Sequence, residues 1–148
     1  MTKRQRVFFW IGAWACLVTA AIHLVGHFAP PPPPANTTEA ELWRLLTTYE
    51  KDFGAGFSRT TADFLKGFSL CFSLFLLWAG AWSLLSLRRG AADPAWLRRV
   101  VLFNALFSAA LLAVSLTYFF LPPIVCVAVI FLGCAGAALP AGSAVQAA

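Results

Sequence analysis

The chain has 148 residues, of which 60% are hydrophobic and 11% are charged, and its formal net charge is +5. This length predicts one domain, and the charged fraction is far below the roughly 25% of an average soluble protein. The composition therefore favours a membrane protein and argues against a soluble enzyme. Its Lys and Arg residues gather at the ends of apolar segments, which argues against nucleic acid as a partner.

Apolar segments of the chain predict an all-α membrane protein, a bundle of four transmembrane helices with the bilayer as its surroundings. Crossing about 30 Å of hydrocarbon takes roughly 20 helical residues. The predicted spans cover residues 7–28, 64–87, 100–121 and 124–140 of a single membrane domain, 1–148. The last span is short and rich in Gly, Ala and Cys, which predicts packing against other helices. We interpret all four cysteines as small packing residues.

The first span carries a stripe of small and polar residues. Gly12, Cys16, Thr19, His23 and Gly26 follow one another by four or three residues, so they share one helical face. Such a face is typical of contact with other helices. Five prolines, residues 30–34, end this helix. They predict that His23, and His27 one turn later, lie just inside one mouth of the bundle.

The first span could instead be a cleaved signal peptide. Its basic start and the sequence Val18-Thr19-Ala20 fit small-residue processing. The apolar run continues past that sequence to Phe28, however, which favours a retained span.

Charge predicts the orientation of the spans. Basic residues precede the first span and bracket the short loop between the second and third, and the positive-inside rule places both regions in the cytoplasm. These basic residues are Lys3, Arg4, Arg6, Arg88, Arg89, Arg98 and Arg99. The connection 29–63 is then translocated, and the N and C termini are both cytoplasmic.

The translocated connection predicts an extracytoplasmic amphipathic helix over residues 38–53. Thr38 and Glu41 are spaced as a capping box at its start. Its apolar residues recur at helical spacing, and we expect this face to cover the bundle mouth as a lid. A flexible joint at 54–56 follows, and Thr60 with Asp63 predicts a second capping box that opens the second span.

Polar residues in the later spans predict seams between helices. In the second span Ser69, Ser73 and Gly80 share a face, and in the third Ser108 and Ser115 share a face with Asn104. We expect Asn104 to bond to another helix, with contact to a polar ligand as the alternative. Residues 121–123 predict a tight turn into the last span.

The two histidines are the strongest candidates for chemistry. Their spacing of four residues is that of helical zinc sites, and Asp63, Glu39 or Glu41 would have to supply further ligands. Leu24 stands where zinc proteases require Glu, which disfavours that class of enzyme. His23 alone is a candidate haem ligand. The structural alternative is hydrogen bonding of the imidazoles within the bundle, and a third is handling of protons or contact with substrate.

Several motifs together resemble a known group. They are His23-Leu24-Val25-Gly26-His27 before a Pro-rich exit, residues 59–63 (RTTAD) before 67–69 (GFS), and residues 119–123 (FFLPP). The chain thereby resembles a family of small bacterial four-helix membrane proteins of unknown function. The resemblance implies a bacterial inner-membrane location and four spans, and it supplies no reaction or cofactor.

We expect a non-enzymatic inner-membrane protein that binds an apolar ligand, a lipid or a membrane-protein partner at its extracytoplasmic mouth. No complete catalytic set is legible. The alternative is a metal- or haem-dependent membrane enzyme or redox protein that uses His23 and His27, and a second alternative is a small transporter or channel. The sequence assigns no cofactor beyond a possible metal ion or haem.

Overall fold

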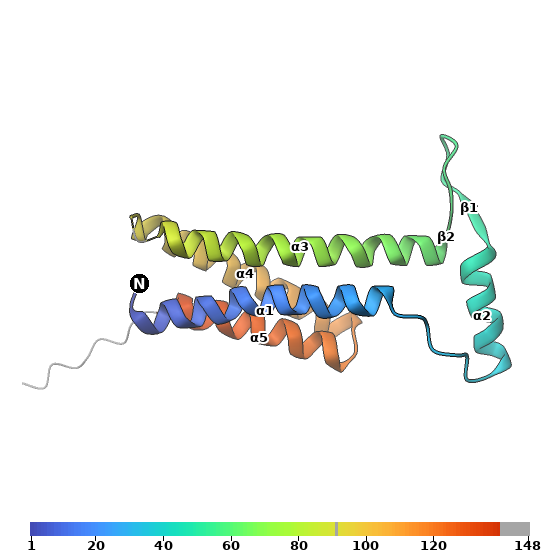
Figure 1. Ribbon diagram of the computed structural model, residues 1–148, viewed down its shortest axis with the longest axis horizontal. Helices are drawn as coiled ribbons and strands as arrows, with labels where there is room; N and C mark the ends of the chain where they lie inside the picture. The colour runs from blue at the N-terminus through green and yellow to red at the C-terminus, as the bar shows by residue number, and fades with distance from the viewer. Residues whose placement is uncertain (91, 140–148) are drawn as a thin grey trace, which may run out of the picture. The chain divides into compact units, whose positions relative to one another are not determined.

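The structure is a computed structural model that describes residues 1–90 and 92–139. The described elements in chain order are α1 (Lys3–Phe28), α2 (Thr37–Thr48), β1 (Glu50–Asp52), β2 (Ser58–Thr60), α3 (Thr61–Arg89), α4 (Pro94–Tyr118) and α5 (Leu121–Ala138) (Figure 1). The chain divides into two compact units. The first unit comprises Met1–Thr19 and the chain from Leu76 onward, and the second comprises Ala20–Phe75.

The prediction of a helical protein with four apolar spans is confirmed. Within the described residues, α1, α3, α4 and α5 are long and apolar enough to cross a membrane, which fits a multi-pass membrane protein in contact with lipid. All four helices begin three to six residues before the predicted spans, in α1 and α3 because polar first residues also adopt helical structure. Residue 140, the end of the predicted fourth span, lies outside the described residues.

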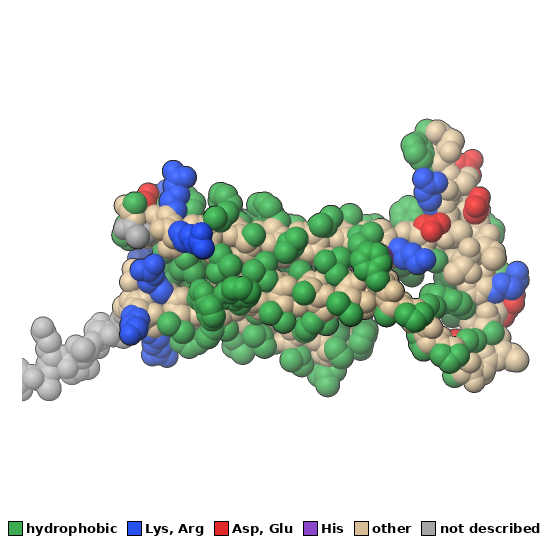
Figure 2. Space-filling view, in the orientation of Figure 1, with side chains coloured by type: hydrophobic (Ala, Val, Ile, Leu, Met, Phe, Trp, Pro, Cys, Tyr) green, Lys and Arg blue, Asp and Glu red, His purple; other side chains and the backbone are tan. Residues whose placement is uncertain are grey.

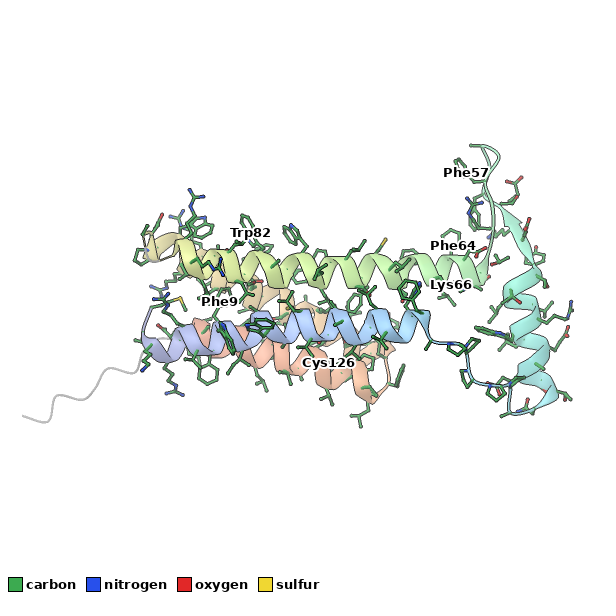
Figure 3. The ribbon with its side chains drawn as sticks, viewed as in Figure 1. Phe9, Phe57, Phe64, Lys66, Trp82 and Cys126 are labelled. Atoms are coloured by element: carbon green, nitrogen blue, oxygen red, sulfur yellow. The ribbon has the colours of Figure 1, made fainter. Side chains whose placement is uncertain are left out.

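In the first unit, α4 and α5 form a helical hairpin that packs with the start of α1 and the end of α3. Its core contains Phe9, Leu76, Val101 and Val127, each at most 2% exposed. Many other apolar side chains remain exposed, among them Phe103, which is 68% exposed, and Trp82 (labelled in Figure 3), which is 45% exposed. In water such a surface would be unfavourable, whereas lipid is a suitable surrounding for it.

Glycines allow the helices of the first unit to approach closely. A methyl group added to Gly133 would lie 2.6 Å from Gly12 N and 2.7 Å from Gly12 Cα, so α1 and α5 cross with their backbones nearly touching. One added to Gly80 would lie 2.9 Å from the carbonyl oxygen of Ala13, which brings α3 equally close to α1. These contacts confirm the predicted seams at Gly12 and Gly80. Gly26, predicted on the same stripe as Gly12, is exposed, and a methyl group there would meet no atom within 4 Å.

The second unit holds α2 and a two-stranded antiparallel hairpin between the ends of α1 and α3. In the hairpin Glu50 pairs with Thr60, and Asp52 pairs with Ser58. Its turn contains three consecutive residues with positive φ, namely Gly54 at 84°, Ala55 at 53° and Gly56 at 80°. The predicted joint at 54–56 is therefore the turn of a hairpin, in which glycine supplies left-handed backbone at low cost.

The predicted cap and the predicted end of the lid helix are wrong, whereas its start at Thr37 lies one residue from the predicted one. Asn36 caps α2 by accepting a hydrogen bond from Glu39 N at 2.8 Å, and Glu39 Oε2 accepts one from Ala35 N at 2.6 Å. Asn36 and Glu39 thus cap the helix in place of Thr38 and Glu41, although Glu39 bonds to the residue before the N-cap and not to the N-cap itself. The helix ends at Thr48, and Glu50–Asp52 form β1, because pairing with β2 overrides the helical spacing of the apolar residues.

Two further predictions are corrected in the first unit. Asn104 Nδ2 donates to the carbonyl oxygen of Val100 at 2.8 Å, one turn earlier in its own helix, where a bond to another helix was predicted. Residues 121–123 form the first turn of α5, with Phe120 as its N-cap, where a tight turn was predicted. Proline is favourable in a first helical turn because the N–H group it lacks has no partner there.

Candidate functional site

The two histidines of α1 pair with two serines of α3 inside the second unit. His23 Nδ1 lies 3.0 Å from Ser73 Oγ, and His27 Nδ1 lies 3.2 Å from Ser69 Oγ. On each helix the two residues are four apart, so the pairs stack one turn above the other. We call these four residues the histidine–serine ladder. These contacts agree with the structural alternative for the two histidines, in which their imidazoles form hydrogen bonds within the bundle.

The hydrogen bonds of the ladder restrict the tautomer of His23. Ser73 Oγ also lies 3.1 Å from the carbonyl oxygen of Ser69, to which it donates. A hydroxyl has one proton, so Ser73 then accepts from the Nδ1–H of His23. In that arrangement Nε2 of His23 holds a lone pair that can accept a hydrogen bond or bind a metal ion.

Each histidine of the ladder contacts one aromatic ring. The ring of Phe72 contacts His23 edge-on with centroids 5.2 Å apart, and Phe28 contacts His27 with centroids 4.9 Å apart. Ser73 is fully buried, whereas both histidines are half-buried. The ladder is therefore a partly buried set of polar contacts with aromatic neighbours.

None of the three candidate carboxylates is free for the histidines, because each has a local partner. Asp63 Oδ2 accepts from Thr60 N at 3.1 Å and from Thr60 Oγ1 at 2.8 Å, while Asp63 N donates to Thr60 Oγ1. This confirms the predicted capping box at the start of α3. Glu39 caps α2, and Glu41 forms an ion pair with Arg44 at 2.6 Å.

The site residues do not assemble into a metal centre. In residues 1–90 and 92–139 there is no cluster of three or more His, Cys, Asp or Glu side chains that could hold a metal ion. A metal bound by His23 and His27 would need its other ligands from outside this set. Asn104 belongs to the first unit and bonds within its own helix.

Sequence reasoning missed the pairing of the histidines with the serines. It found Ser69 and Ser73 on one face of the second span and His23 on the inner face of the first. The signal that joins them is the equal spacing of four residues in two consecutive spans. Two antiparallel helices can match such pairs at two points of one seam.

Comparisons of the chain with protein-family models, with curated proteins and with solved structures find no match. The site is therefore interpreted from its own residues and contacts.

Proposed function

We propose that the protein is a non-enzymatic, multi-pass protein of the bacterial inner membrane that binds a lipid at its outer mouth. The binding surface would be the apolar face of α2 together with the hairpin. The resemblance to small bacterial four-helix membrane proteins supports the location. The ladder would sit at the same mouth and hold α1 against α3.

The exposed apolar face of α2 is the observation that carries this proposal. Not one residue of α2 is buried, and Leu42, Leu45 and Tyr49, its C-cap, are 55%, 45% and 67% exposed. These three residues fall on one helical face. An exposed apolar face of this kind marks a surface that binds a partner, a ligand or a membrane.

The hairpin extends this apolar surface. Phe53 and Phe57 are 50% and 60% exposed, and Figure 3 shows Phe57 near the hairpin tip. The ring of Phe53 also contacts Phe64 at the start of α3, with centroids 4.7 Å apart. The apolar residues of α2, the hairpin and α3 thus offer acyl chains an extended contact area.

The distribution of charge supports an outer location for the second unit. That unit holds five of the six acidic residues, whereas the first unit holds seven of the eleven Lys and Arg residues. Figure 2 shows Lys and Arg side chains gathered at the end of the first unit where α1 begins. By the positive-inside rule this end would be cytoplasmic, and the loop that carries α2 would be extracytoplasmic.

The test is to measure the lipid that copurifies with the full chain after extraction in a mild detergent. Leu45→Asp places a charge in the apolar face, and Ala40→Asp places the same charge on the opposite, exposed face of α2. We expect Leu45→Asp to lower the bound lipid about tenfold, because one buried leucine contributes about 1.5–3 kcal/mol. Ala40→Asp should leave it unchanged.

Equal lipid content in the wild type and in both variants would contradict the proposal. Loss of a copurifying protein instead of a lipid on Leu45→Asp would identify a protein partner and would also reject lipid as the ligand.

A further inference from the structure

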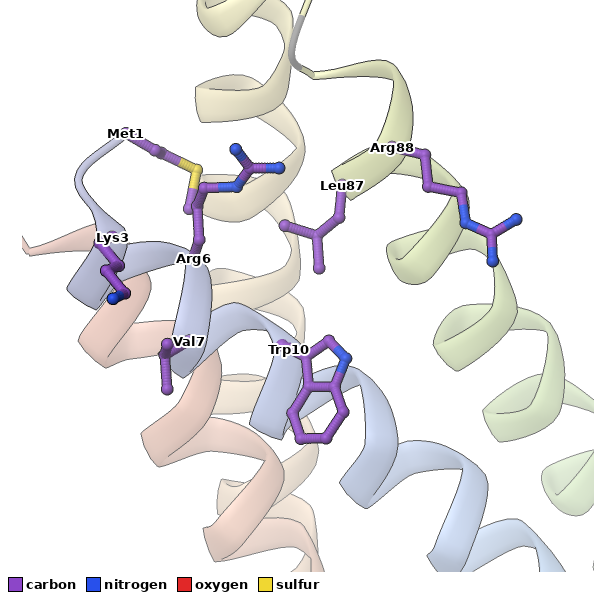
Figure 4. A pocket seen from close by; sticks show the side chains of 7 residues that line it. All are labelled: Met1, Lys3, Arg6, Val7, Trp10, Leu87 and Arg88. Atoms are coloured by element: carbon purple, nitrogen blue, oxygen red, sulfur yellow. The ribbon is translucent and has the colours of Figure 1, made fainter.

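The first unit contains a cavity that combines positive charge with an apolar wall, at the end where α1 begins and α3 ends. Its volume is about 780 Å³, and it is lined by Met1, Lys3, Arg6, Val7, Trp10, Leu87 and Arg88. Figure 4 shows Arg6 and Leu87 extending into the space between α1 and α3, with the Trp10 indole beside them. Sequence reasoning used these basic residues only to orient the spans. The volume falls within the range of cavities that bind small ligands.

The cations of this cavity have no acidic partner within the described residues. The single ion pair found there joins Arg44 and Glu41 in the other unit. The first unit has one acidic residue, Asp93, whose carboxylate caps α4 by accepting from Trp96 N at 2.9 Å. Lys3, Arg6 and Arg88 are therefore available to an external anion.

The apolar wall favours an amphiphile over a free ion. Val7 and Trp10 are 50% and 52% exposed, and both lie on α1, whose apolar length fits a membrane span. If Arg6 binds the anionic headgroup of a lipid, Val7 and Trp10 lie beside it on α1 and would contact the acyl chain of that lipid. Tryptophan is also enriched at the level of lipid headgroups.

We propose that this cavity binds the phosphate headgroup of an anionic membrane phospholipid. Arg6 contacts the phosphate, Lys3 and Arg88 add positive charge at the rim of the cavity, and the acyl chains follow Val7 and Trp10. Cationic cavities between membrane helices recognise anionic lipids through this combination of charge and apolar surface. The site lies in a different unit from the proposed outer lipid-binding surface and does not depend on it.

The experiment uses the full chain in a nonionic detergent, with phosphatidylglycerol and phosphatidylcholine of identical acyl chains added in equal amounts. Native mass spectrometry counts the bound lipids. The test variant is Arg6→Gln with Arg88→Gln. The matched control, Arg4→Gln with Arg89→Gln, removes the same charge from the same helix ends, but these two residues do not line the cavity.

The wild type is expected to retain phosphatidylglycerol over phosphatidylcholine. The test variant should lose roughly 25-fold in affinity for phosphatidylglycerol, since each cation near an anionic lipid contributes about a fivefold factor. The control variant should lose no more than about threefold, because Arg4 and Arg89 do not line the cavity and add only to the general charge of this end. If the double variant does not fold, Arg6→Gln is compared with Arg4→Gln in the same way.

Three outcomes would overturn the proposal. Equal retention of the two lipids would show that the cavity does not select for charge. Equal losses in the test and control variants would assign the preference to the general charge of this end. Displacement of phosphatidylglycerol by inorganic phosphate alone would make the cavity a free-anion site.

Discussion

At the scale of single residues, the serines of α3 divide into those with partners and one without. Ser73 Oγ bonds to His23 and to Ser69, whereas Ser86 Oγ is the buried side-chain oxygen that lacks a hydrogen-bond partner within the described residues. Both serines are at most 1% exposed. They form a matched pair for measuring what the ladder contributes.

Ser73→Ala is expected to lower the free energy of unfolding by about 1 kcal/mol, because it leaves the imidazole of His23 without its partner. Ser86→Ala should be neutral or stabilising by up to about 1 kcal/mol, since it removes an unsatisfied polar atom. Thermal unfolding in detergent micelles measures both changes. A larger loss for Ser86→Ala than for Ser73→Ala would show that the ladder does not stabilise the packing of α1 on α3.

At the scale of helices, two glycines allow the effect of helix packing on stability to be measured apart from the effect of helix propensity. Gly133 lies against the backbone of Gly12, whereas a methyl group at Gly26 would meet no atom within 4 Å. Both glycines lie within helices. An alanine is therefore sterically excluded at position 133 and accommodated at position 26.

Gly133→Ala is expected to destabilise the protein by about 1–3 kcal/mol through overpacking of α1 against α5. Gly26→Ala should stabilise it by up to about 1 kcal/mol, because alanine favours the helix. Thermal unfolding of the two variants checks this, and a stable Gly133→Ala variant would contradict the close approach of α1 and α5.

The ion pair of α2 predicts a dependence on pH. The hydrogen bond from Arg44 lowers the pKa of Glu41, so the carboxylate is more readily ionised in the folded helix than in the unfolded chain. The stabilisation is present above the unfolded pKa and is lost as the pH falls through the lowered folded pKa.

Amide exchange of α2 should therefore stay constant from neutral pH down to the ordinary range of glutamate, after correction for intrinsic rates. Protection should decrease only below that range. Arg44→Gln should largely remove this decrease, because the pKa of Glu41 then no longer differs between the folded and the unfolded chain. An unchanged profile in this variant would show that the pair does not form in solution.

The spans could be predicted from apolar length alone, while the elements between them could be predicted only in part. The capping box of Thr60 and Asp63 was predicted because both partners are local in sequence. The cap of α2 was misplaced by two residues because Asn36 and Thr38 have similar capping chemistry. The hairpin was missed because its pairing depends on the backbone of a second segment, and the ladder was missed because its partners lie on different helices.

At the scale of the whole molecule, the account requires that α1 remains in the membrane and that the loop carrying α2 lies on the opposite side from the basic helix ends. Both proposed lipid sites depend on membrane insertion, and the outer site also depends on this orientation. Ala55 lies in the hairpin turn and Ala92 lies in the turn before α4. Both side chains are exposed, so each alanine can be replaced by cysteine.

The direct measurement is labelling of Ala55→Cys and Ala92→Cys in intact cells with a membrane-impermeant maleimide, in a chain whose four native cysteines are replaced by alanine. The account predicts that the cysteine at 55 is labelled from outside and that the one at 92 is labelled only after permeabilisation. Labelling of position 92 from outside, or protection of position 55, would contradict it.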